Sequence, residues 1–367
     1  MRIEAAELQS FRLRLRTPLA TALGPLASRE GVLLSLRNAD GCIGYGEATP
    51  LPAFGTESLD AARRSLEACT ALLEGADPGE PEDLLGFIDR RCPPTSTARA
   101  AIDCAVHDLV AQDAGQSMAS WLAGKEGRSA RPTVTVSALL VSRSPRALTL
   151  EAQHAVESGF RTLKLKVGVG PVSSDLERVA AVRSAVGPVP RIRVDANGAW
   201  SPDQALSRLE ALARFGLEFA EQPVAAGDVA GLARVRRDAS VPVAADESAC
   251  SEAELRSVLD AEAADVVILK PSAVGGISRA RVAVELARAA GVEVVPTSFL
   301  DGAVAVLSAL HLASSLPGHL PACGLATSAL LENDLAPPPL PERGRLRVST
   351  APGLGVRPWG RSRGRAA

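Results

Sequence analysis

The sequence predicts an α/β protein in which a small α+β domain precedes an eight-stranded parallel barrel. From about residue 132 onward, eight short runs rich in β-branched residues alternate with helical stretches rich in Ala, Leu and Arg. The runs begin roughly every 25 to 30 residues, the length of one βα unit, and eight such units indicate a closed barrel. Ahead of the barrel, strands come first and helices follow, as is typical of an α+β domain.

The α+β domain is predicted to span residues 1–125. Its strands alternate polar and apolar residues, and its helices place apolar residues at helical spacing. Ser96 or Thr97 is the expected N-cap of the last helix. The expected strands are Ile3–Leu15, Gly31–Arg37 and Cys42–Glu47, with a turn at 38–41, and the expected helices are Ser58–Leu73, Pro81–Arg90 and Thr95–Leu122.

The barrel is predicted to span residues 126–335. No strand is followed by a GxGxxG turn, which disfavours the alternative of a doubly wound open sheet. A segment at about 336–356 is expected to complete the first domain, and residues 357–367 to form a flexible tail. The expected barrel strands are Thr133–Leu140, Thr162–Gly168, Arg191–Asn197, Glu218–Pro223, Val241–Ser248, Asp265–Pro271, Val292–Ser298 and, weakly, Leu320–Leu325.

The composition excludes several classes of protein. Lys and Arg nearly balance Asp and Glu, and the net charge of −2 gives no electrostatic case for binding nucleic acid or an acidic membrane surface. No signal peptide is evident and no apolar run reaches about 18 residues, so we expect a cytoplasmic protein without a membrane span. The six cysteines form no CxxC pair, and we expect reduced thiols.

Charged residues at the C-terminal ends of five consecutive strands break the apolar pattern of the barrel. Buried parallel strands are nearly all apolar, and this rim carries the active site of barrel enzymes. Residues two apart share one face of a strand, so Lys164 and Lys166 point inward together. Arg193, Asp195 and Asn197 share the inward face of the next strand.

The following three strands continue this pattern. Glu221 lies near the end of the expected strand 218–223, just before a proline, and Lys270 lies near the end of the expected strand 265–271. Asp246 and Glu247 lie near the end of the expected strand 241–248 and point to opposite faces, so only one of them can join the inward-facing charged residues. A single acid at a strand end usually caps the next helix. Three carboxylates flanked by lysines are costly to bury together unless they neutralise one another or bind something.

Three inward carboxylates without histidine or cysteine favour Mg²⁺, or Mn²⁺ as the alternative, over zinc. The four histidines lie away from the strand ends, and we expect them on helix surfaces or loops: His107, His154, His311 and His319. Three carboxylates, one divalent ion and three lysines leave a net positive site. Such a site holds a small-molecule carboxylate as its substrate.

A carboxylate bound to the ion makes the neighbouring carbon a better acid. The base needs a pKa near neutral, and crowding by Lys164 is expected to lower the pKa of Lys166 toward that range. Lys270 faces the substrate from across the barrel. The residues therefore predict proton abstraction next to a carboxylate through a metal-held enediolate.

At these residues the sequence resembles the enolase superfamily, for which a lysine base and an Mg²⁺-stabilised enediolate are known. The lysine on the far side resembles the muconate-lactonizing subgroup. The resemblance covers nearly the whole chain and implies a modified (β/α)7β barrel with an α+β capping domain. The matching motifs are Lys164-Leu-Lys166, Asp195-Ala-Asn197, Glu221-Gln-Pro223, Asp246-Glu-Ser248 and Lys270-Pro271.

Within the subgroup, segments 44–57 and 323–327 most resemble the o-succinylbenzoate synthase family of menaquinone biosynthesis. That family dehydrates a cyclohexadiene carboxylate that carries a succinyl chain. The resemblance implies Mg²⁺ held by Asp195, Glu221 and Asp246, with Lys166 as acid and base, Lys270 opposite it and Lys164 beside it; Arg193, Asn197, Ser298 and Gly324 are weaker matches for support or substrate contact. In the capping loops, Leu51 and Phe54 are expected to contact the substrate ring.

Several alternatives stay open. N-succinylamino-acid racemases, epimerases and cycloisomerases of the same subgroup share the metal motifs. Dipeptide epimerases typically carry Asp-x-Asp near the last strand, whereas residues 322–328 contain no acid. In a different class, Lys270 or Lys166 of a metal-free aldolase forms a Schiff base, which borohydride traps. That alternative leaves three inward carboxylates without a task, and the oligomeric state is open.

Overall fold

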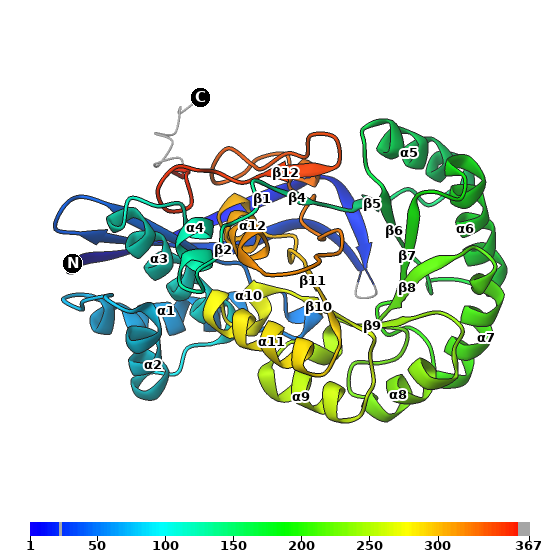
Figure 1. The fold of residues 1–367 in the computed structure, drawn as a ribbon, viewed down its shortest axis with the longest axis horizontal. Helices are drawn as coiled ribbons and strands as arrows, with labels where there is room; N and C mark the ends of the chain where they lie inside the picture. The colour runs from blue at the N-terminus through cyan, green and yellow to red at the C-terminus, as the bar shows by residue number, and fades with distance from the viewer. Residues whose placement is uncertain (22–23, 359–367) are drawn as a thin grey trace.

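The computed structural model describes residues 1–21 and 24–358, and it begins with a long antiparallel hairpin (Figure 1). Strands β1 (Ile3–Thr21), β2 (Gly24–Asn38) and β3 (Ile43–Ala48) form one sheet in the order β1-β2-β3. The helices that follow are α1 (Leu59–Leu73), α2 (Pro81–Arg91), α3 (Ser96–Asp113) and α4 (Met118–Gly124). Together they form the predicted α+β domain, and the 3-10 turn η1 (Pro52–Phe54) connects sheet and helices.

The predicted helix over 95–122 is wrong in two details. It is two helices, α3 and α4, because Gly115 between them adopts a positive φ of 64°. Its start is not capped by Ser96 or Thr97. A side chain distant in the sequence does this instead: the carboxylate of Glu57 accepts hydrogen bonds from the backbone N–H of Thr97 (3.0 Å).

Helix α3 is buried on nearly all sides because it lies between the sheet and the barrel. Close packing on β3 requires a residue without a side chain at Gly46, where a Cβ atom would lie 1.8 Å from the carbonyl oxygen of Ala101. His107 is enclosed in this helix and His311 in α12 (Ala303–Ser315), so the expectation that both lie on surfaces is wrong.

The barrel follows as a curled parallel sheet with helices outside it (Figure 1). Its seven strands run in sequence order, and each pairs with the next. They are β5 (Ala138–Leu140), β6 (Thr162–Lys166), β7 (Arg191–Asp195), β8 (Leu217–Glu221), β9 (Val243–Ala245), β10 (Val266–Leu269) and β11 (Glu293–Pro296). The outer helices are α5 (Pro145–Glu157), α6 (Val172–Val186), α7 (Pro202–Ala213), α8 (Val229–Asp238), α9 (Glu252–Asp260), α10 (Pro271–Val274), α11 (Ile277–Ala289) and α12, with 3-10 turns η2 (Glu247–Ala249) and η3 (Ser328–Leu330).

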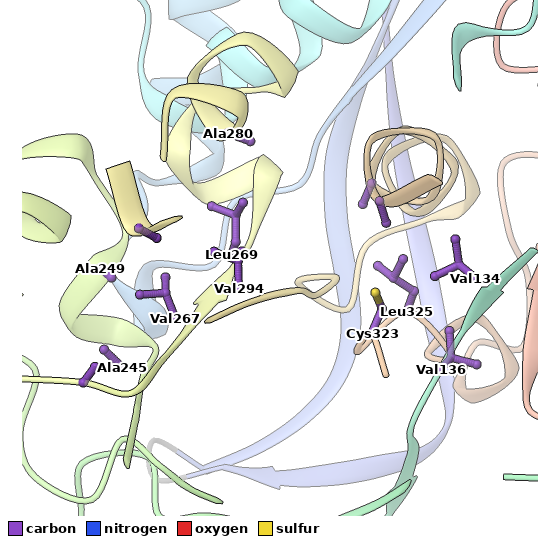
Figure 2. Close-up of a cluster of buried hydrophobic side chains, with 14 of the residues drawn as sticks. Val134, Val136, Ala245, Ala249, Val267, Leu269, Ala280, Val294, Cys323 and Leu325 are labelled. Carbon is purple, nitrogen blue, oxygen red and sulfur yellow. The ribbon is translucent and has the colours of Figure 1, made fainter. Parts of the chain in front are cut away.

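Two residues in the weak eighth run join the ends of this sheet. Cys323 bridges Val136 next to β5, and Gly324 bridges Thr297 just after β11. Their backbones are hydrogen-bonded on both sides, as in the bond from the Ser137 N–H to the Cys323 carbonyl (2.9 Å). Figure 2 shows Cys323 and Leu325 beside Val136 and its neighbours in the buried cluster. The modified (β/α)7β barrel with its capping domain is therefore confirmed.

The first predicted barrel strand, 133–140, is two strands with different partners. Its second half is β5, whereas its first half, β4 (Thr133–Thr135), pairs antiparallel with β12 (Arg345–Arg347) near the C-terminus. The C-terminal segment then returns to the first domain, where the Met118 N–H donates to the Gly353 carbonyl (2.8 Å). Of the predicted tail, residues 359–367 lie outside the described residues.

The barrel interior is apolar below a polar rim. Phe219, Ala244, Val266, Ile268 and Val295 form a separate buried cluster contributed by β8 to β11. Charged side chains follow at the C-terminal ends of the strands. Among the described residues, no helix is both long and apolar enough to cross a membrane.

Candidate active site

A cavity of about 500 Å³ lies at the C-terminal ends of the barrel strands. Residues from the first domain, including Leu19, Leu51 and Phe54, form part of its wall. The chain has only four lysines, and three of them line this cavity: Lys164, Lys166 and Lys270. The cavity also receives the three carboxylates predicted from the sequence, those of Asp195, Glu221 and Asp246.

Two lysines are paired directly with these carboxylates. The Nζ atom of Lys164 lies 2.5 Å from Oε1 of Glu221 and 2.9 Å from Oδ2 of Asp195. Lys270 donates a hydrogen bond of 2.6 Å to Oδ2 of Asp246. The residues of strands β6 to β10 thus meet in one layer, as the alternation of side chains along each strand predicts.

These pairs change the pKa values of both lysines. Burial alone would lower the pKa of Lys164, but the charges of Asp195 and Glu221 outweigh burial and raise it. Lys270 likewise has a raised pKa, because Asp246 and Glu247 outweigh its burial. The carboxylates beside Lys164 and Lys270 therefore stabilise the charged form of both ammonium groups.

The carboxylates respond to the same charges. Burial opposes ionisation of Asp195, but Lys164 and Lys166 outweigh it and lower the pKa of Asp195 to about 2. Burial and the charge of Asp195 raise the pKa of Glu221 to about 8. Burial and the neighbouring carboxylate therefore favour the protonated form of Glu221, although Lys164 lies beside it.

Lys166 has a different partner. It donates a hydrogen bond to Oδ1 of Asn197, and its Nζ atom is 3.8 Å from Oδ2 of Asp195. The Asn197 amide in turn donates to Glu247 (2.9 Å). Asp246 thus faces the cavity, while Glu247 lies behind Asn197 and supports it. Of the two adjacent acids, Asp246 is therefore the one that joins the lysines in the cavity.

A buried glutamine joins two strand ends and was missed as a site residue in the sequence. Oε1 of Gln222 accepts hydrogen bonds from the backbone N–H groups of Asp246 (2.8 Å) and Ser248 (3.2 Å). Gln222 directly follows Glu221 and has a positive φ of 39°, a conformation that L residues rarely adopt. Its side chain therefore fixes the position of Asp246 relative to Glu221.

Two aromatic rings cover the lysines. Phe54 and Phe299 meet edge to face with ring centroids 6.0 Å apart. The Nζ atoms of Lys166 and Lys270 lie 5.9 and 5.8 Å from the centroid of Phe54. A ring from the first domain therefore stands near both amines.

Arg29 holds this cover onto the barrel. It is 2% exposed and donates to the carbonyls of Thr49 (2.6 Å) and Pro50 (3.0 Å) in the loop that leads to Phe54. It also donates to the carbonyl of Leu300 (3.3 Å) in the loop after β11. Burial lowers the pKa of Arg29, and the charges of the buried carboxylates of Asp301 and Glu47 oppose this effect only in part.

The weaker sequence matches lie at the cavity but have protein partners. Arg193 is 2% exposed, forms an ion pair of 2.6 Å with Glu218 and donates to the Ala322 carbonyl (2.7 Å). The hydroxyl of Ser298 lies 2.7 Å from that of Thr327, and its backbone N–H donates to the carbonyl of Gly324 (3.0 Å). Their predicted part in substrate contact stays a prediction.

Both parts of the chain match known protein families. Residues 147–361 match the family model described as enolase C-terminal domain-like, and residues 5–123 match the N-terminal domain of mandelate racemase and muconate lactonizing enzyme. The chain belongs to the enolase superfamily.

The chain is similar to relatives in this superfamily that have different activities. An o-succinylbenzoate synthase of Thermobifida fusca is 43% identical over 221 residues, 59% of this chain and 67% of the relative. An N-succinyl-L-Arg/Lys racemase of Bacillus cereus is 30% identical over 317 residues, 86% of this chain and 85% of the relative. The crystal structure of a dipeptide epimerase of Enterococcus faecalis with Mg and L-Leu-L-Tyr has a TM-score of 0.90 at 28% identity, covering 97% of this chain and 99% of that one.

The donor set at the strand ends fits a hard divalent cation. Asp195, Glu221 and Asp246 offer only carboxylate oxygens, the ligands that Mg²⁺ prefers. Among residues 1–21 and 24–358, no three acidic, histidine or cysteine side chains already stand in the arrangement of a metal cluster. Lys164 lies between two of the carboxylates and contacts one oxygen of each.

Proposed function

We propose that this protein is an o-succinylbenzoate synthase. It would remove water from 2-succinyl-6-hydroxy-2,4-cyclohexadiene-1-carboxylate and so serve menaquinone biosynthesis. The observation that carries the proposal is the 43% identity to a synthase, higher than the 30% identity to the racemase, although it spans less of the chain.

The charges of the cavity support a substrate without an ammonium group. Apart from the three carboxylates, Asp175 is the only acidic residue among the described ones that line the cavity. Its Oδ2 atom accepts hydrogen bonds from the Gly168 N–H (2.9 Å) and from Arg208 (3.2 Å). A dipeptide would find no unpaired carboxylate for its N-terminus, which disfavours an epimerase.

Two amines would act on the substrate from opposite sides of the barrel. Lys166, on β6, takes the proton from the ring carbon that carries the carboxylate, and it then returns this proton to the hydroxyl group on the neighbouring ring carbon. That group leaves as water, the electrons of the broken C–H bond form the new double bond, and the ring becomes aromatic. Lys270 contributes positive charge from the other side of the barrel, and Lys164 holds the carboxylate layer together.

The acids Asp195, Glu221 and Asp246 would hold Mg²⁺, or Mn²⁺ in its place. When bound, the divalent ion supplies positive charge beside the substrate carboxylate and so makes the neighbouring carbon more acidic. Closing of Phe54 and Leu51 over the cavity would exclude water from the amines.

The decisive experiment follows the diene absorbance after the substrate and Mg²⁺ are added. Rapid loss of absorbance, absent in a Lys166→Ala variant, is expected.

N-succinylamino-acid racemase is the second candidate, favoured by the relative from Bacillus cereus. No turnover of the diene together with rapid inversion of N-succinylamino acids would overturn the synthase in favour of that activity.

A further inference from the structure

One side of the cavity mouth is lined by residues that have no part in the proton transfer described above. We call it the β5–β6 rim, because its residues follow strands β5 and β6: Val141, Arg143, Val169, Gly170 and Ser174. Val141 is 40% and Val169 83% exposed, and both belong to the few large apolar residues on the surface. Exposed apolar side chains at a cavity mouth are typical of ligand contact.

Arg143 distinguishes this rim from the rest of the cavity. It lines the cavity and is exposed, and among the described residues it forms neither an ion pair nor a side-chain hydrogen bond. The other arginines of the cavity wall are paired. Arg193 contacts Glu218 at 2.6 Å, and Arg178 lies 3.6 Å from Asp175.

The rim is within reach of a substrate held by the carboxylate layer. Strand β5 pairs with β6 in the register Leu139 with Lys164, and adjacent strands lie about 4.8 Å apart. Arg143 follows the end of β5 at Leu140 by three residues, so it stands beside the strand end that carries Lys166. A side arm of a few carbon atoms spans such a distance.

We propose that the β5–β6 rim binds the distal carboxylate of the substrate's acyl arm, with Arg143 as its cationic partner. This inference rests on the proposed function, because the arm in question is the succinyl group. Val141 and Val169 contact the two methylene groups, and the guanidinium pairs with the terminal carboxylate. A planar guanidinium matches a carboxylate through two parallel hydrogen bonds.

The test compares two ligands that differ only at the end of the arm. They are o-succinylbenzoate and 2-butanoylbenzoate, in which a methyl group replaces the distal carboxylate. Their dissociation constants are measured by calorimetry in the presence of Mg²⁺. We expect the wild type to prefer o-succinylbenzoate about tenfold, which is the effect of one charge-assisted pair.

The variants then assign this preference to one residue. Arg143→Gln is expected to bind both ligands equally, and Arg143→Lys to keep part of the preference. Arg146→Gln is the matched control, because Arg146 is exposed in the first turn of α5 and does not line the cavity. A wild type without preference, or an Arg143→Gln variant that keeps the full preference, would overturn the assignment.

Kinetics separate this inference from the proposed function. If the wild type dehydrates the diene, Arg143→Gln should raise KM about tenfold while kcat changes by less than about threefold, since only binding of the arm is lost. A fall in kcat with unchanged KM contradicts the assignment. If the diene is not dehydrated, the proposed function fails, and the same comparison with N-succinyl- and N-butanoylphenylalanine still decides the role of Arg143.

Discussion

The Nζ atom of Lys164 lies 2.5 Å from Oε1 of Glu221, so the charges of β6 and β8 meet across the intervening strand β7. Asp195, at the end of β7, completes the contact at 2.9 Å from the same nitrogen. An ammonium group therefore occupies the space between two carboxylates. A divalent cation held by the same acids would share these two carboxylates with the amine.

Glu221→Gln is expected to weaken Mg²⁺ binding at least about tenfold, because an amide, unlike the carboxyl group, cannot ionise when a cation binds and so leaves the donor set one negative charge short. Titration calorimetry of the folded protein with MgCl₂ measures the change without any substrate. Glu210→Gln, at an exposed position of α7, is the control and should bind Mg²⁺ like the wild type. Equal affinity in the Glu221 variant would place the metal elsewhere.

Lys166→Ala is expected to slow exchange of the substrate's α-proton with solvent by a factor of about 10² to 10⁴, the usual effect of losing a general base. Proton NMR of the substrate in D₂O follows this exchange directly. Lys125→Ala serves as the control, since Lys125 lies outside the cavity and pairs with Glu80 at 2.6 Å. Exchange at the wild-type rate in the Lys166 variant would rule out this lysine as the base.

Arg29→Met is expected to destabilise the protein by about 3 to 5 kcal/mol, because it leaves the carbonyl oxygens of Thr49, Pro50 and Leu300 without their hydrogen-bond donor. It also removes a positive charge close to the carboxyl groups of Asp301 and Glu47. Urea unfolding measures the loss, and Arg12→Met on the neighbouring strand is the control, since Arg12 is 64% exposed. A loss below about 1 kcal/mol would show that other groups satisfy these three carbonyls when the arginine is absent.

The barrel and its polar layer were predictable because both depend on short-range rules. Strand spacing indicates βα units, and the period of two along a strand tells which side chains share a face. Lys164, Asp195 and Glu221 accordingly come together as predicted. The alternation of side chains along a strand does not predict which charges pair. The raised pKa of Lys164 depends on its distances to Asp195 and Glu221, which only the structure provides.

The failures concern contacts between residues distant in the sequence. Glu57 caps α3 from 40 positions away, and no local signal distinguishes it from Ser96 or Thr97. β4 leaves the barrel because β12, more than 200 residues later, pairs with it. The burial of His107 and His311 follows from helices enclosed on all sides, which periodicity alone does not reveal.

His311 shows how such burial affects stability. Its Nδ1 atom accepts a hydrogen bond from the Ala119 N–H (3.0 Å), and its Nε2 lies 3.2 Å from the Leu354 carbonyl. These partners fix the neutral tautomer with the proton on Nε2. Burial lowers the pKa of His311 from 6.5 to about 4. The unfolded chain therefore binds a proton between these two pH values that the folded protein does not.

Stability should accordingly fall as the pH drops from 6.5 toward 4, and His311 should contribute up to about 3 kcal/mol of this loss. His311→Asn keeps an acceptor for the Ala119 N–H but does not titrate, so its stability should depend less on pH by that amount. Urea unfolding at pH 7 and pH 4.5 measures the difference. His154→Asn, exposed on α5, should retain the wild-type dependence. If the His311 variant retains it too, the acid sensitivity arises from the buried carboxylates instead.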